Sequence, residues 1–127
     1  MATEDSRHIL VVDDESAVLR LITVLLKTSG YKTLGATNGR EAFALFKEHE
    51  NEVSLLITDI IMPEMDGVEL AIQIRRLRPN LPVIFVSGFC EKIPDSFQEW
   101  EGLDKPFRPS EMLKKIANMI PSAKSPA

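Results

Sequence analysis

The sequence has few of the residues that several common functions require. A single cysteine, Cys90, excludes a disulfide bond within the chain and any cysteine-rich metal site. No apolar run approaches the roughly 20 residues that a membrane-spanning helix needs. Positive charge is not in excess either, since 15 lysines and arginines stand against 19 aspartates and glutamates. This balance argues against direct binding to nucleic acid, and we expect a cytoplasmic protein without a membrane partner.

The length and composition fit one folded unit. The chain has 127 residues, of which 44% are hydrophobic, which is enough for one buried core and too little for a second domain. We therefore expect a single domain over residues 1–127, with a core from about residue 8 to residue 120 between polar ends.

Short apolar runs alternate with helical patterns along the chain. Residues 9–12, 55–57 and 83–86 lack polar alternation, which is typical of strands buried on both faces. Residues 31–36 are a weaker, edge-like strand, and a short fifth strand precedes Lys105. Five strands separated by helices predict an α/β fold with a parallel sheet covered on both faces.

Helix boundaries are marked by capping residues. Gly30 ends a helix whose apolar face repeats from position 18 to position 26. Asn38 and Asp66 are each followed three residues later by a glutamate, which predicts a helix start at both. Pro109 suits the first turn of the last helix.

Two stretches between these elements are less regular. Residues 91–102 support only a short or irregular fourth helix, because Pro94 interrupts the pattern. A basic cluster falls at the end of the third helix, where cations complement the helix dipole, and we expect it to be solvated: Arg75, Arg76 and Arg78.

The residues whose side chains can bind a ligand or take part in a reaction fall where predicted strands end. Asp13 and Asp14 follow the first strand, Asp59 the third, Ser87 the fourth and Lys105 the last. In an open parallel sheet, ligands bind outside the carboxyl ends of the strands, so we expect these five residues in one pocket. Acidic residues at strand ends also cap helices. Capping alone does not explain the acid pair, the single aspartate, the serine and the lysine at the ends of four strands.

Three carboxylates in one pocket repel one another unless a cation lies among them. With no histidine or cysteine at the predicted site, the oxygen donors Asp13, Asp14 and Asp59 favour Mg²⁺. A carboxylate can take up a phosphoryl group as a nucleophile, and Asp59, after the most central strand, is the predicted phosphoacceptor. Lys105 and Ser87 are placed to contact two phosphoryl oxygens.

Four segments together resemble the receiver domain of two-component response regulators: VVDDE, ITDIIMPEMDGVEL, VIFVSG and DKPF. The resemblance covers nearly the whole chain and implies a doubly wound, flavodoxin-like sheet of strand order 2-1-3-4-5. It implies Asp59 as phosphoacceptor, Asp13 and Asp14 at Mg²⁺, and the backbone carbonyl of Ile61 as a further metal ligand. Ser87 would be the switch hydroxyl, Lys105 the phosphate partner, and the bond before Pro106 a cis peptide.

The same resemblance implies a partner and a mode of action. The phosphoryl donor would be a histidine kinase or a histidine phosphotransfer protein, and an output protein, not identified by the sequence, would read the phosphorylated state. Such a protein is not an enzyme in the usual sense, because it promotes only its own phosphorylation and slow dephosphorylation. The chain fits a single-domain regulator or a receiver module of a larger protein such as a hybrid histidine kinase.

The sequence departs from the receiver pattern near the predicted site. Gly102 stands three residues before the lysine, where receivers carry a tyrosine or phenylalanine that follows the switch hydroxyl. Trp100 is either its replacement or an ordinary packing residue. With Ile61 and Phe89 beside the site, no polar side chain is placed to orient water, so we expect a long-lived aspartyl phosphate.

Two other functions remain open alternatives at this point. One is a phosphate-independent interaction module that kept the fold and lost the switch, which Gly102 favours and the intact acid residues oppose. The other is a phosphatase of the haloacid-dehalogenase type, which needs a second carboxylate two residues after the nucleophile. That position is Ile61 here, which argues against it.

Overall fold

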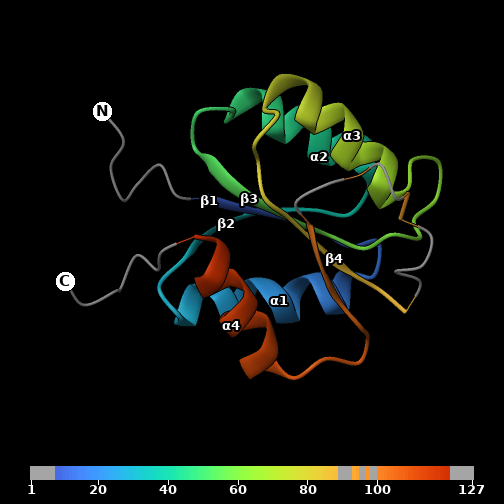
Figure 1. Ribbon diagram of the computed structural model, residues 1–127. Coiled ribbons are helices and arrows are strands. Elements are labelled where there is room, and N and C mark those ends of the chain that lie inside the picture. Colours follow the sequence, from blue (N-terminus) through green and yellow to red (C-terminus); the bar gives the residue numbers. More distant parts are fainter. Residues whose placement is uncertain (1–7, 89–92, 95–96, 98–99, 121–127) are drawn as a thin grey trace.

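A parallel five-stranded sheet forms the centre of the molecule (Figure 1). The computed structural model describes residues 8–88, 93, 94, 97 and 100–120. The strands are β1 (His8–Val12), β2 (Lys32–Ala36), β3 (Val53–Thr58), β4 (Val83–Val86) and β5 (Trp100–Leu103). Their order, β2-β1-β3-β4-β5, confirms the strand order implied by the resemblance.

Helices cover both faces of this sheet, as predicted (Figure 1). On one face lie α2 (Gly39–Glu48) and α3 (Gly67–Leu77), and on the other lie α1 (Ser16–Thr28) and the last helix, α4 (Pro109–Met119). Alternate residues of each central strand point into one or the other layer, so that Leu10 and Phe85 pack with α2 and α3, whereas Val11 and Ile84 pack with α1 and α4.

The predicted helix starts at Asn38, Asp66 and Pro109 are confirmed. The side chain of Asn38 accepts a hydrogen bond from the backbone N–H of Glu41 at 2.7 Å. The side chain of Asp66 accepts one from Glu69 at 2.8 Å, and α4 begins at Pro109. These caps satisfy backbone donors that a helix start would otherwise leave unpaired, so they set where α2 and α3 begin.

The prediction for residues 91–102 is wrong at its end. Residues 100–102 belong to β5, because they pair in parallel register with β4. Of the preceding residues, Ile93, Pro94 and Phe97 are described and lie outside any helix. The rest of the predicted fourth helix falls on residues 89–92, 95, 96, 98 and 99, which lie outside the described residues.

The basic cluster at the end of α3 also differs from the prediction that it is solvated. Arg78 donates from Nη1 to the backbone carbonyls of Glu50 and Val53 at 2.6 Å and 3.2 Å. The Arg75 guanidinium lies 4.4 Å from the centre of the Phe97 ring, and its Nε donates to a backbone carbonyl. Two of the three arginines therefore hold the end of α3 against neighbouring segments. Arg76 is exposed, so the prediction of a solvated side chain holds for it alone among the three.

Among the described residues, no helix combines the length and the apolar character that crossing a membrane requires.

Candidate functional site

The register of the strands brings the predicted site residues to one edge of the sheet. Val12, the last residue of β1, lies opposite Thr58, the last residue of β3, so Asp13 and Asp59 leave the sheet side by side. Asp59 also donates its backbone N–H to the carbonyl of Val12 at 3.0 Å. On the other side, the backbone N–H of Ser87 donates to Leu103 at the end of β5.

Lys105 follows β5, and its ammonium group contacts the residues at the ends of β1 and β3. Its Nζ lies 2.9 Å from Oδ2 of Asp13 and 3.0 Å from Oδ2 of Asp59. Burial alone lowers the pKa of Lys105, but hydrogen bonds to both carboxylates outweigh it, so the pKa lies above its ordinary value. A charged ammonium thus lies between two nearly buried carboxylates.

The three aspartates form an oxygen-only cluster suited to a divalent cation. Carboxylate oxygens of Asp13, Asp14 and Asp59 all lie within 4.8 Å of one another. Two ligands on opposite sides of Mg²⁺ are about 4 Å apart, because each Mg–O bond is about 2.0–2.1 Å. Side-chain rotation can bring the three oxygens to the spacing that Mg²⁺ requires, and Asp14, which is exposed, lies on the side open to waters. The residues present fit the ion.

The carboxylate of Asp59 is oriented by its own loop. Its Oδ1 accepts a hydrogen bond from the backbone N–H of Ile60 at 2.7 Å, which leaves Oδ2 facing Lys105. The Thr58 hydroxyl donates to the backbone carbonyl of Asp59 at 2.9 Å. Neither hydrogen bond was anticipated, because no sequence pattern specifies them.

Gly67 is in close contact with this loop. A Cβ atom at Gly67 would lie 1.8 Å from the backbone oxygen of Asp59, much nearer than any real contact. The backbone N–H of Gly67 also donates to the carbonyl of Ile60 at 2.8 Å. Only glycine lets the first turn of α3 approach the backbone that carries Asp59 so closely.

Glu15 was missed as a neighbour of the site. Its backbone N–H donates to Oδ1 of Asp13 at 2.9 Å, and its Oε1 lies 3.9 Å from Nζ of Lys105. It follows the acid pair directly, and that adjacency is the signal that could have found it. Adjacency along the chain does not reveal the direction of a side chain, however, so only the fold places its carboxylate on the Lys105 side.

Trp100 does not replace the absent switch aromatic. It lies opposite Val83, at the start of β4, so it is about 13 Å along the strands from Ser87. Its ring packs edge-on against Phe85 at a centroid distance of 5.9 Å. Of the two readings of Trp100, the packing role is therefore correct, and Gly102, opposite Phe85, adds no side chain to this face.

The sequence model described as the response regulator receiver domain matches residues 9–117. The chain belongs to this family. The cis peptide bond between Lys105 and Pro106 is also present, as the resemblance implied. As a receiver domain, the protein is a signalling module of two-component systems and not an enzyme of the usual kind.

Relatives with known names support this assignment. The receiver domain is 34% identical to the response regulator receiver protein CpdR of Brucella abortus over 121 residues, which covers 92% of this chain and 99% of CpdR. It is 28% identical to the response regulator SaeR of Staphylococcus aureus, over 89% of this chain and half of SaeR.

Solved structures agree on the fold. A receiver domain protein of Clostridium thermocellum superposes with a TM-score of 0.79 at 30% identity, covering 90% of this chain and 94% of that one. The receiver domain of the hybrid histidine kinase CckA superposes with a TM-score of 0.78 at 32% identity, covering 88% and 97%.

Proposed function

We propose that this receiver domain takes a phosphoryl group onto Asp59 from a phosphohistidine of a histidine kinase or histidine phosphotransfer protein. The observation that carries the proposal is the position of the Lys105 ammonium, within 3.0 Å of the carboxylates of both Asp13 and Asp59. A cation held there faces a phosphoryl group bound to Asp59 without any rearrangement of the main chain.

In the proposed transfer, a carboxylate oxygen of Asp59 attacks the phosphorus atom. The new bond joins that oxygen to phosphorus, while the bond between phosphorus and the donor's imidazole nitrogen breaks, and the nitrogen keeps the electron pair. Oδ2 is the oxygen assigned to the attack, because its donor, Lys105, is a side chain that can move to a phosphoryl oxygen, whereas Oδ1 accepts from the backbone N–H of Ile60, which is fixed. Lys105 then exchanges its hydrogen bond to Oδ2 for one to a phosphoryl oxygen.

Four groups are proposed to hold Mg²⁺: the carboxylates of Asp13, Asp14 and Asp59 and the backbone carbonyl of Ile61. When bound, the ion neutralises charge on the phosphoryl oxygens as the group is transferred. Asp13 is kept in position by the N–H of Glu15, and it remains close to Lys105, so the acid cluster and the ammonium act as one unit.

The output of the switch is proposed to arise at the end of β4. Ser87 is buried there, directly after Val86, and its hydroxyl is proposed to turn toward a phosphoryl oxygen. Since Gly102 offers no ring to follow this motion, the change passes through the backbone after Ser87 rather than through an aromatic rotation. A partner that reads this segment would distinguish the two states.

The first test is intact mass after incubation with acetyl phosphate, with and without Mg²⁺. We expect the wild type to gain one phosphoryl group only with Mg²⁺, and Asp59→Asn to gain none. The matched control is Asp66→Asn, which changes a nearby aspartate by the same group and keeps a residue able to cap α3. A gain that survives Asp59→Asn would mean that the nucleophile is another residue.

The alternative is a phosphate-independent interaction module. It is favoured by Gly102 and would explain a wild type that takes up no phosphate under any condition. Partner affinity that is unchanged between the wild type and Asp59→Asn under phosphorylating conditions would also support it. The similarity to CpdR over nearly its full length and to the receiver of a hybrid kinase is compatible with a separate regulator and with a module.

A further inference from the structure

The peptide unit that joins Asp59 to Ile60 is held at both of its polar ends. Its carbonyl, which belongs to Asp59, accepts a hydrogen bond from the Thr58 hydroxyl at 2.9 Å. Its N–H, which belongs to Ile60, donates to Oδ1 of the Asp59 carboxylate at 2.7 Å. The C=O and N–H of a trans peptide lie in one plane and point in opposite directions, so one cannot turn without the other. The Thr58 hydroxyl is therefore linked to the Asp59 carboxylate through one rigid unit.

Burial makes this link hard to replace. Thr58 is fully buried and Ile60 is 1% exposed, so water does not take over a lost hydrogen bond at this unit. The side chain of Thr58 points to the same sheet face as Leu56, into the apolar layer under α2 and α3. A valine would have the same shape there without a polar group to satisfy. Packing alone therefore does not account for a threonine at this position.

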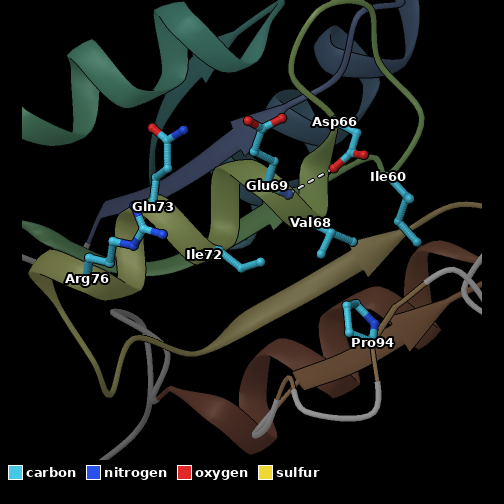
Figure 2. A pocket seen from close by; sticks show the side chains of 8 residues that line it. All are labelled: Ile60, Asp66, Val68, Glu69, Ile72, Gln73, Arg76 and Pro94. Atoms are coloured by element: carbon cyan, nitrogen blue, oxygen red, sulfur yellow. Dashed lines mark hydrogen bonds between the residues drawn. The ribbon is translucent and has the colours of Figure 1, made fainter.

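The start of α3 lies against the same peptide unit. The three atoms nearest to a Cβ at Gly67 would be the backbone oxygen and carbon of Asp59 and the Cα of Ile60, at 1.8, 2.8 and 3.1 Å. The N–H of Gly67 donates to the carbonyl of Ile60 at 2.8 Å. The helix start is fixed in turn by Asp66, which accepts the hydrogen bond from Glu69 that is dashed in Figure 2. The peptide unit thus packs on a part of α3 that is itself held in place.

We propose that Thr58 is a positioning residue for the phosphoacceptor, because its hydroxyl holds the peptide unit whose N–H orients the Asp59 carboxylate. With Oδ1 held in this way, Oδ2 faces the Lys105 ammonium at 3.0 Å. The inference rests on the proposed phosphoryl transfer to Asp59, and Thr58 itself does not contact the phosphoryl group. Without the hydroxyl, the peptide unit turns more freely, the carboxylate loses its fixed orientation, and fewer encounters present Oδ2 to the phosphorus atom.

Two substitutions separate the hydroxyl from the shape of the side chain. Thr58→Val keeps the shape and removes the hydroxyl, whereas Thr58→Ser keeps the hydroxyl and removes a methyl group. Thr33→Val makes the same chemical change on β2 and is the matched control. At saturating Mg²⁺, the rate of phosphorylation by acetyl phosphate should fall about tenfold in Thr58→Val and stay within about twofold of the wild type in the other two variants.

The amide of Ile60 reports on the carboxylate without any phosphoryl transfer. Its exchange with solvent deuterium, followed by NMR on the unphosphorylated protein, should be at least about tenfold faster in Thr58→Val and unchanged in Thr58→Ser. The amide of Ile57, within β3 between β1 and β4, is the internal reference. A general loss of stability speeds exchange at both amides, whereas loss of the local hydrogen bonds speeds exchange at Ile60 alone.

The two measurements distinguish this inference from the proposed function. A wild type that takes up no phosphoryl group would overturn the proposed function, whereas the exchange of Ile60 would still decide whether Thr58 orients the carboxylate. Unchanged exchange at Ile60 in Thr58→Val, or phosphorylation of this variant at the wild-type rate, would overturn the inference. An equal loss of rate in Thr58→Ser would also overturn it, because the effect would then come from packing and not from the hydroxyl.

Discussion

Replacement of Gly67 by alanine should damage both the stability and the chemistry of the receiver. The new methyl group would begin 1.8 Å from the backbone oxygen of Asp59, and real contacts of this kind are not shorter than 3.0 Å. The two backbones must therefore separate by about 1.2 Å. Because the atom in the way is backbone and not a flexible side chain, the loop after β3 or the first turn of α3 has to move.

The expected cost follows from what that movement breaks. The hydrogen bond from Gly67 to the carbonyl of Ile60 and the one from Thr58 to the carbonyl of Asp59 both depend on the present spacing. Overpacking that shifts backbone typically costs 1–3 kcal/mol, so we expect a loss of about 3 kcal/mol in the free energy of unfolding. For a domain of this size, the melting temperature should fall by about 10 °C.

Urea and thermal unfolding followed by circular dichroism measure the first effect, and the rate of phosphorylation by acetyl phosphate measures the second. A displacement of about 1 Å at a reacting group can cost roughly 100-fold in rate. Gly35→Ala is the control, because a Cβ there meets only Leu19 at an ordinary 3.5 Å, and its stability should change by less than about 1 kcal/mol. A Gly67→Ala protein that melts with the wild type and is phosphorylated at the same rate would refute the reasoning.

Three further predictions concern single side chains. Lys105→Met should lower the free energy of unfolding, measured in urea without Mg²⁺, by about 3 kcal/mol, because it leaves two nearly buried carboxylates without their cation. Saturating Mg²⁺ should restore part of this loss. Ile61→Asn should shorten the lifetime of the aspartyl phosphate about tenfold, followed by mass after donor removal, because Ile61 is half-exposed and its amide replacement can orient water. The pKa of Glu52 lies below its usual 4.5, because its carboxylate is hydrogen-bonded to His49. The stabilising contribution of Glu52 should therefore be present above pH 4.5 and disappear as the pH falls through the lowered pKa. Melting curves of Glu52→Gln and wild type should therefore converge in acid.

Each of these predictions has an outcome that contradicts it. Equal stability of Lys105→Met and wild type in metal-free buffer would mean that the ammonium does not offset carboxylate repulsion. A wild-type phosphate half-life of seconds would remove the premise of the Ile61 prediction. A constant difference between Glu52→Gln and wild type at all pH values, or the same convergence in a Glu50→Gln control, would show that the His49 contact is not responsible.

Much of the site could be predicted because each strand ends in the same way. A run of apolar residues is followed at once by a polar one, as at Asp13, Asp59 and Ser87, and parallel strands bring their carboxyl ends to one edge. The caps at Asn38 and Asp66 are equally local, since a side chain bonds a backbone N–H three residues away. Features of this kind depend on short-range geometry, which a sequence pattern records.

The failures have the opposite character. The short fifth strand predicted before Lys105 is present, but it begins at Trp100, within the stretch predicted as the fourth helix, because residues 100–103 pair with β4. Arg75 and Arg78 are bound by carbonyls and a ring that lie on other segments, so their spacing along α3 could not separate them from the solvated Arg76.

By itself, the sequence determined the alternation of strands and helices, the helix starts and the identity of the residues at the strand ends, because these follow from local periodicity and capping. Only the tertiary structure decided which groups touch: the Lys105 ammonium between two carboxylates, and Gly67 against the backbone of Asp59. These contacts join segments that are distant along the chain, and their distances are set by how the layers pack.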